Sequence, residues 1–437
     1  MGVPGLAARR AAAALLAGVL DKRRSLDDQE APLAGLAPGE RARARSLAAE
    51  TLRHLGRIDA LLAGFLRRPP PEPAMNALRL ATAEMHLDAV PAHAAVDAAV
   101  RLVRSHPGGA RLSGLVNAVA RRVADGGPPL WDAAPEAGLP DWLAGPVDAA
   151  WGVEARRAIE AAQRARPPVD LTPKRPEEAG AWAAVLGAER LPTGSLRLAA
   201  RPQLSGLPGY AEGAWWVQDA AAALPVRLLG TLAGRTALDL CAAPGGKTMQ
   251  LAAAGAAVVA VDASAARLGR LRANLARTGL AAETVVADAL AWEPGRRFAA
   301  VLLDAPCTAS GTIRRHPDLP WLRTGLETAR LVAAQAALIR RAWGWVAPGG
   351  RLVYCVCSLL PEEGEAQAAR FLAETPEARV VPPELALGLD PAWIDPGGAL
   401  RTRPDFWPER SGLDGFYAVC LERPASRPPG TAQRASD

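Results

Sequence analysis

The chain has 437 residues, half of them hydrophobic, which predicts two or three globular domains, each with a buried core. No apolar run in the sequence reaches the roughly 18 residues that a membrane-spanning helix requires, so we expect no membrane partner. The net charge of +6 lies entirely in residues 1–125, which hold 18 Lys and Arg against 12 Asp and Glu.

Residues 1–125 are predicted to form an all-α domain. Apolar residues recur at three- and four-residue spacing in stretches such as ERARARSLAAETLRHLGRIDALLAGFLRR, and RRPPPEP, VPAH and HPGGA separate them. The opening stretch, AARRAAAALLAGVLDKR, reads as a helix without a convincing cleavage site, which favours a cytoplasmic protein over an exported one. The surplus charge is almost all arginine, which suits a polyanionic partner, although a plain solvated surface is equally compatible with it.

Residues 126–210 are predicted to form a linker and a small α+β connector. DGGPPLWDAAPEAGLPDW, which starts at Asp125, is rich in Gly and Pro and is typical of a linker. AGPVDAAWGVEARRAIEAAQRA then predicts helix, and a mixed stretch ending in SLRLAA comes after it.

Residues 211–424 are predicted to form an α/β domain. TALDLCAA, AAVVAVDA, AETVVADA, FAAVLLDAP and GRLVYCVCS have the pattern of buried strands, and helical stretches such as AARLGRLRANLARTG and ETARLVAAQAALIRRAWGWV lie between them. This alternation predicts a parallel sheet covered on both faces. The remaining residues, 425–437, have the composition of a disordered tail.

LDLCAAPGGKT, from Leu238 to Thr248, lies between a strand and a helix and has the features of a cofactor loop. Gly245 and Gly246 allow a tight turn and bring amides at a helix N-terminus close to a ligand. Asp262, sixteen residues after Gly246, ends the next strand, where an acid can accept both hydroxyls of a ribose, and Asp288 ends the following strand, near the expected adenine edge. We therefore expect an adenosine-bearing cofactor. NAD is the competing reading, but neither G-x-G-x-x-G nor a phosphate-binding P-loop is present.

The five cysteines all lie in the C-terminal half, and their odd number and wide spacing argue against a disulfide framework. The one-residue gap between Cys355 and Cys357, with no answering Cys/His pair, argues against a zinc site. Asp304 and Cys307 stand at the carboxyl end of the fourth predicted strand, and Cys357 stands at the same end of the next core strand. Because open α/β sheets bind ligands at this edge, the Cys307 and Cys357 thiols are expected to converge near the cofactor.

Four ordered motifs, CAAPGGKT, DAPC, RRHPD and CSLLPEE, resemble those of the RNA (cytosine-5)-methyltransferases. They look most like the RsmB branch, also called Sun or Fmu, which modifies small-subunit ribosomal RNA. VPAHAAVDAAV and LVNAVARR resemble the NusB-like RNA-binding domain fused to that enzyme, and GLDGFYAVCLERP resembles its closing strand. The resemblance covers most of residues 1–125 and 215–423.

This resemblance implies a Rossmann-like S-adenosylmethionine methyltransferase sheet that comes after the NusB-like domain and the connector. It implies that Cys357 is the nucleophile and that Cys307 assists release of the product. Asp262, Asp288 and Asp304 would be further contacts to the cofactor or to the base. The loop that would hold S-adenosylmethionine consists of Cys241, Ala242, Ala243, Pro244, Gly245, Gly246 and Lys247.

The identity of the nucleophile depends on position in the motif. Cys355 and Cys357 are two residues apart in a predicted strand and so face the same way, but only Cys357 directly precedes Ser358 and LLPEE. Cys355 is then expected to be a small buried side chain. DNA cytosine methyltransferases take their nucleophile from the Pro-Cys of the motif that corresponds to Pro306-Cys307, whereas a second cysteine at the position of Cys357 marks the RNA enzymes. The presence of both cysteines therefore favours RNA.

The resemblance therefore predicts a monomeric, metal-free enzyme that methylates carbon 5 of a cytosine in 16S ribosomal RNA. Transfer RNA or another ribosomal site is an alternative substrate for the same chemistry. A non-catalytic NusB-like RNA-binding assembly factor is an alternative of another class. The glycines, the acids and both thiols of the motifs are all present, which argues against that last reading.

Overall fold

The computed structural model describes residues 5–425, and its contacts divide them into two compact units. The first unit holds the described residues up to Asp148 together with Gln163–Ala165 and Ile313–Gly325. The second unit holds Ala149–Ala162, Arg166–Thr312 and the described residues from Leu326 onward. The predicted domain boundaries stay predictions, and the predicted disordered tail, apart from Ala425, lies outside the described residues.

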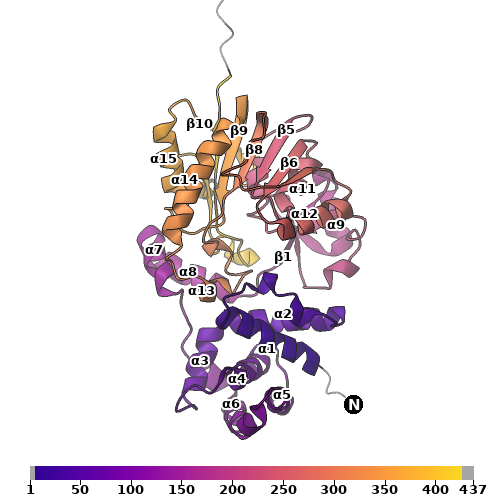
Figure 1. Ribbon diagram of the computed structural model, residues 1–437, viewed down its shortest axis with the longest axis vertical. Coiled ribbons are helices and arrows are strands. Elements are labelled where there is room, and N and C mark those ends of the chain that lie inside the picture. Colours follow the sequence, from indigo (N-terminus) through magenta and orange to yellow (C-terminus); the bar gives the residue numbers. More distant parts are fainter. Residues whose placement is uncertain (1–4, 426–437) are drawn as a thin grey trace, which may run out of the picture. The chain divides into compact units, whose positions relative to one another are not determined.

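The first unit is helical (Figure 1), as residues 1–125 predict. Its helices share one apolar core. The long stretch predicted around residues 40–68 is two helices, because the backbone of His54 (φ −108°, ψ 15°) leaves the helical region. No helix within residues 5–425 is long and apolar enough to cross a membrane. The helices are α1 (Leu6–Leu20), α2 (Pro38–Arg53), α3 (Leu55–Ala63), α4 (Glu72–His86), α5 (Ala92–Arg104) and α6 (Ser113–Ala133).

The first half of the Gly- and Pro-rich stretch after Asp125, which the sequence predicts as a linker, forms the end of α6, whereas residues 134–140 are not helical. Gly127 takes a left-handed φ of 53° and kinks the helix there. Pro128 and Pro129 stand at the start of the second segment, where a missing N–H costs little. Trp131 is buried and stacks on His86, with ring centroids 5.1 Å apart. The composition therefore marks a kink inside a packed helix, because Trp131 anchors the segment after the prolines.

Ile313–Gly325, which contains the RRHPD motif and the short helix α13 (Leu319–Leu322), belongs to the helical unit. The Trp321 indole donates to the Leu52 carbonyl (3.1 Å), and the Asp318 carboxylate accepts from the Leu26 amide (2.9 Å). A segment encoded between the two thiol motifs is thus packed among the first helices of the chain.

The connector is α+β, as predicted. A buried ion pair joins its strands: Arg197 donates through two nitrogens to both oxygens of Asp170, at 2.7 Å each. α7 (Asp141–Trp151) and α8 (Val153–Arg164) form the predicted helical stretch before it. The antiparallel sheet has the order β2-β3-β1-β4, with β1 (Val169–Pro173), β2 (Ala188–Arg190), β3 (Leu196–Leu198), β4 (Trp215–Val217) and α9 (Ala179–Leu186).

The larger sheet of the second unit has the order β10-β12-β9-β8-β5-β6-β7 (Figure 1). The five predicted strands, β5 to β9, are parallel, whereas β10, β11 and β12 are antiparallel, so the sheet is mixed. The strands are β5 (Thr236–Leu240), β6 (Ala257–Asp262), β7 (Glu283–Val286), β8 (Phe298–Asp304), β9 (Val346–Val356), β10 (Arg379–Val380), β11 (Leu400–Thr402) and β12 (Phe416–Glu422).

Helices cover both faces of this sheet, as the buried strand pattern predicts. On β8, Val301 belongs to the apolar cluster that contains Leu338 of α14, and its neighbour Leu302 belongs to the cluster that contains Leu224 of α10 and Leu251 of α11. The helices are α10 (Leu224–Arg227), α11 (Gly246–Ala253), α12 (Ala265–Thr278), α14 (Thr328–Gly344) and α15 (Glu365–Glu374).

The strand register brings the carboxyl ends of four strands to one edge. Leu240 at the end of β5 pairs with Val261 of β6 and with Leu303 of β8. Asp304 at the end of β8 pairs with Cys355 near the end of β9. The loops that come after these strands therefore emerge side by side.

Candidate active site

The predicted cofactor loop turns sharply between β5 and α11. Gly245 has a φ of 107°, and a Cβ atom there would lie 2.8 Å from Cγ of Leu271, so only glycine fits. Cys241 also has a left-handed φ, 59°, which is uncommon for a residue with a side chain. Burial raises the pKa of the Cys241 thiol to about 12, so this cysteine stays protonated and serves packing. The turn leaves the first amides of α11, which begins at Gly246, at the edge of the sheet.

Asp262 fixes this loop from the end of β6. Its carboxylate accepts from the amides of Ala243 (3.1 Å) and Ser264 (2.9 Å) and is 4% exposed. A carboxylate at this position suits the hydroxyls of a ribose, and the amides of α11 suit an anionic group, so the donor set fits an adenosine-bearing cofactor. Asp288 lies two residues beyond β7, is exposed and accepts from the Leu290 amide (2.9 Å). No hydrogen bond or ion pair in the described chain joins Asp288 to the other predicted site residues.

Asp304 connects the cofactor loop to the cysteines. One of its oxygens accepts from Nζ of Lys247 at 2.8 Å, and the other lies 3.5 Å from Sγ of Cys355. Burial alone would lower the pKa of Lys247, but the Asp304 carboxylate, together with Cys355 and Cys357, outweighs burial and raises it. Lys247 is therefore a buried cation that orients Asp304.

The two predicted catalytic sulfurs meet. Sγ of Cys307 and Sγ of Cys357 lie 3.5 Å apart, which confirms the expected convergence of the two strand ends. Cys357 is partly exposed, whereas Cys355 is fully buried, as predicted, and burial raises its pKa well above the usual value. The hydrogen bond with Cys357, together with burial, raises the pKa of Cys307 far above that of an ordinary thiol. Solvent accessibility thus distinguishes Cys357 from Cys355, whereas their positions in a strand do not distinguish them.

A buried acid that the sequence did not single out links the residues next to the two thiols. The carboxylate of Glu363 accepts from the Thr308 hydroxyl (2.6 Å) and amide (2.9 Å) and from the Ser358 hydroxyl (2.5 Å). Gln335 of α14 donates a further hydrogen bond (3.0 Å). An acid at this point in the chain suits the start of the following helix, but α15 begins at Glu365 and Glu363 is fully buried. No local pattern distinguishes it from the exposed Glu362 beside it.

The backbone around Cys357 is fixed from other sides as well. Its carbonyl accepts from the Gly311 amide (3.0 Å), and the carbonyl of Ser358 accepts from the Arg401 guanidinium (2.5 Å). Arg401 also makes a double hydrogen bond to Glu365, at 2.9 and 2.6 Å. The segment that carries the partly exposed thiol is therefore held in place before any substrate arrives.

Other predicted residues fall outside this cluster. Arg314 and Arg315 of the RRHPD motif suit either RNA phosphates or a loop cap, but Arg314 is fully buried, so only the exposed Arg315 retains the phosphate prediction. Trp215 and Trp216 are buried, as expected for core side chains. Within residues 5–425 there is no group of three or more His, Cys, Asp or Glu side chains that could hold a metal ion.

Comparison with known proteins agrees with this arrangement. Residues 226–422 match a protein-family model described as 16S rRNA methyltransferase RsmB/F, and residues 6–125 match the NusB family. The chain is 35% identical over 438 residues to ribosomal RNA small subunit methyltransferase B of Xanthomonas campestris, covering 95% of this chain and 97% of the relative. The same-named protein of Pseudomonas putida is 36% identical, with coverages of 97% and 99%. The crystal structure of PH0851 superposes with a TM-score of 0.71 at 23% identity, over 97% of this chain and 100% of that one, which shows a common fold.

Proposed function

Because the chain belongs to the RsmB/F family of methyltransferases and carries a NusB-family domain, we propose that it methylates carbon 5 of a cytosine in 16S ribosomal RNA. S-adenosylmethionine is the proposed cofactor, held by Cys241–Lys247 and Asp262, and it supplies an electrophilic methyl group. The observation that carries the proposal is the 3.5 Å contact between the Cys307 and Cys357 sulfurs at the cofactor edge of the sheet.

The two thiols suit two different steps. Carbon 5 of cytosine is a poor nucleophile, and a thiolate that adds to carbon 6 makes carbon 5 electron-rich. We assign this addition to Cys357, because it is the partly exposed sulfur of the pair. After methylation, a water molecule takes the proton from carbon 5, the electron pair left behind re-forms the double bond between carbons 5 and 6, and the bond between carbon 6 and Cys357 breaks to release the sulfur as a thiolate. Cys307, which burial and hydrogen bonding keep protonated, assists this release.

Asp304 is assigned to the base. One of its oxygens is already held by Lys247, so its position is fixed before the pyrimidine enters. The carboxylate accepts a hydrogen bond from the protonated N3 of the ring and so supports the charge that develops during attack on carbon 6. A base within a stem must leave its stack to reach the site, so we propose a loop or a flipped nucleotide as the form that binds.

The helical unit is proposed to hold the RNA. Several arginines paired with acids elsewhere in the unit stabilise the fold, but others are exposed and have no ion pair within the described chain. Neutralising phosphate-binding arginines should reduce the slope of log affinity against log salt by about one per lost phosphate contact. Replacing the exposed, unpaired set by glutamine, with the paired Arg101→Gln as control, tests this on 16S ribosomal RNA. The set is Arg104, Arg111, Arg121 and Arg122.

The deciding experiment mixes the purified full chain, S-adenosylmethionine and unmethylated 16S ribosomal RNA and maps 5-methylcytosine by bisulfite sequencing. Cys357→Ala should abolish methylation while cofactor binding survives. Cys307→Ala should accumulate a protein–RNA adduct that is visible on a denaturing gel. Full activity of Cys357→Ala, or loss in Cys355→Ala alone, would refute the assignment. Methylation of transfer RNA but not 16S ribosomal RNA would keep the chemistry and change the substrate.

A further inference from the structure

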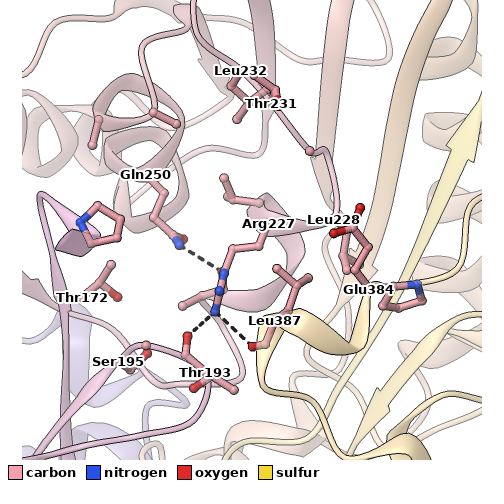
Figure 2. Close-up of a pocket in the computed structure, with 18 of the residues that line it drawn as sticks. Thr172, Thr193, Ser195, Arg227, Leu228, Thr231, Leu232, Gln250, Glu384 and Leu387 are labelled. Atoms are coloured by element: carbon pink, nitrogen blue, oxygen red, sulfur yellow. Dashed lines mark hydrogen bonds between the residues drawn. The ribbon is translucent and has the colours of Figure 1, made fainter. Parts of the chain in front are cut away.

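A cavity of about 510 Å³ lies within the second unit, apart from the candidate active site (Figure 2). None of the cofactor-loop residues, the three acids or the two catalytic cysteines lines it. Its walls come from the connector sheet, the end of α10 with the loop before β5, α11 and residues 381–387. The active site lies beyond the carboxyl ends of the strands, whereas much of this cavity is built from residues that precede them.

The guanidinium of Arg227, the last residue of α10, projects into the cavity (Figure 2). Its Nη1 donates to the carbonyl oxygens of Thr193 and Leu387, the second at 3.4 Å. Within the described chain no acid lies within ion-pair distance of Arg227, and its Nε and Nη2 groups have no hydrogen-bond partner. An Arg side chain with unused donors on a concave wall is equipped to bind an anion in two-pronged fashion.

A second polar group in the same wall lacks a partner. Thr193 is 4% exposed, and its hydroxyl oxygen is buried without a hydrogen bond in the described chain. A buried hydroxyl left unpaired costs free energy, which a ligand that bonds to it would recover. This observation is independent of the charge of Arg227 and points to the same part of the cavity.

The remaining charges also favour an anion. Lys174 and Arg351 line the cavity as well, and Glu384 is the only acid among the described residues that line it. Lys174 donates to the Thr278 carbonyl, and Arg351 is paired with Glu422 at 3.2 Å. Arg227 is therefore the cation left to meet a ligand.

Most of the wall is apolar, and its volume is in the range of pockets that hold a small organic molecule. A chain of nucleotides would need a row of cations, whereas this cavity offers one unpaired guanidinium against a hydrophobic lining. The apolar residues that line it include Trp216, Val226, Leu232, Val381, Pro382 and Leu387.

We propose that this cavity binds a small organic carboxylate with an apolar body, whose carboxylate pairs with Arg227 and the Thr193 hydroxyl. The planar fork of a guanidinium matches a carboxylate, which makes this headgroup the best fit. The site is separate from the proposed cofactor site and does not depend on the methyl-transfer reaction.

Isothermal titration of the full chain with naphthalene-2-carboxylate tests this proposal, with naphthalene-2-carboxamide as the neutral probe of the same shape. We expect the carboxylate to bind at least tenfold more tightly than the amide. Arg227→Gln should remove that preference and leave the amide unchanged, while Arg227→Lys should keep part of it. Arg330→Gln, an exposed arginine on α14, is the matched control. Equal binding of both probes, no binding of either, or an unchanged preference in Arg227→Gln would overturn the proposal.

Two further measurements keep the test independent of folding defects and of the cofactor site. Thr231 is an exposed residue of the lining, so Thr231→Trp should block the carboxylate while the melting temperature is preserved. Saturating S-adenosylmethionine should leave carboxylate binding unchanged. Displacement by the cofactor, or normal binding to Thr231→Trp, would place the probe elsewhere and overturn the proposal.

Discussion

Two buried glutamates, one in each unit, are stabilised in opposite ways. Glu84 of α4, in the helical unit, is 1% exposed and accepts from the guanidinium groups of Arg9 (2.8 Å) and Arg43 (2.9 Å). Glu363, close to the Cys307 and Cys357 thiols, accepts only from hydroxyl and amide donors, and no cation lies within ion-pair distance of it in the described chain. The first carboxylate is held by two cations, and the second is held by neutral hydrogen-bond donors alone.

This difference in hydrogen-bond partners suggests different roles: Glu84 stabilises the fold, and Glu363 supports the candidate active site. Two guanidinium groups beside the thiols would favour thiolates on both sulfurs. After the hydrogen bond with Cys357 and burial, the charge of Glu363 is a further cause of the raised pKa of Cys307. Thr308 follows Cys307 and Ser358 follows Cys357, and the hydroxyls of both residues donate to the same Glu363 carboxylate. We infer that Glu363 positions both thiols while it helps to keep Cys307 protonated.

The largest expected effect is on catalysis. Glu363→Gln keeps the shape of the side chain but turns an NH₂ group toward donors, so the loops after both thiols should shift. A displacement of this kind is expected to lower kcat about 100-fold, with little change in cofactor affinity. Single-turnover methylation and titration of the cofactor measure the two quantities. Glu362→Gln, at the exposed neighbouring residue, is the control. A folded Glu363→Gln protein with the kcat of the wild type would show that Glu363 does not position the thiols.

The next effect is on stability alone. Glu84→Gln leaves the guanidinium groups of Arg9 and Arg43 without their carboxylate, which should cost about 3 kcal/mol of unfolding free energy. Because no catalytic group is involved, kcat per folded molecule should stay unchanged. Calorimetry and active-site-normalised kinetics provide the two readouts. A loss of kcat as large as that of Glu363→Gln would show that the two acids do not differ in role.

The smallest effect concerns acid stability of the helical unit. Burial lowers the pKa of His54 to about 4; Glu50 opposes this shift, and Arg53, Arg57 and Arg164 add to it. A lowered histidine pKa stabilises the fold above about pH 6.5, and this contribution is lost as the pH falls toward 4. It amounts to at most about 3 kcal/mol.

Replacing His54 tests that pH window. His54→Gln should therefore show a flatter decline in melting temperature between pH 6.5 and 4.5 than the wild-type chain, measured by scanning calorimetry. The exposed His93→Gln is the control and should behave like the wild type. An equally steep decline in His54→Gln would assign the acid sensitivity to another group.

Local sequence pattern was sufficient to predict most of the methyltransferase sheet. The strands β5 to β9 are short apolar runs, and parallel strands end at a common edge, so the meeting of Cys307 and Cys357 could be predicted from order along the chain. The roles of these thiols, and those of Asp262, Asp288 and Asp304, remain predictions from the family resemblance.

The features that the sequence did not predict depend on distant packing. Glu363 becomes a central acceptor only because the chain turns between Ser358 and α15 and buries it against Thr308, 55 residues earlier. In the Gly-Pro stretch after Asp125, the residues up to Ala133 form a packed helix because Trp131 stacks on His86. Neither partner can be read from spacing along the chain.

Ile313–Gly325 leaves the methyltransferase unit after Thr312 and returns to it at Leu326, yet it packs with the first helices. A fragment that starts after residue 125 would therefore carry Trp321 without the Leu52 carbonyl that receives its indole proton. A protein expressed from residue 126 onward would contain the Ile313–Gly325 segment without the helices against which this segment packs. We therefore do not expect this fragment to be an active enzyme by itself. The helical unit is thus built from segments that are far apart in the sequence, so a division of the chain at residue 125 divides this unit as well.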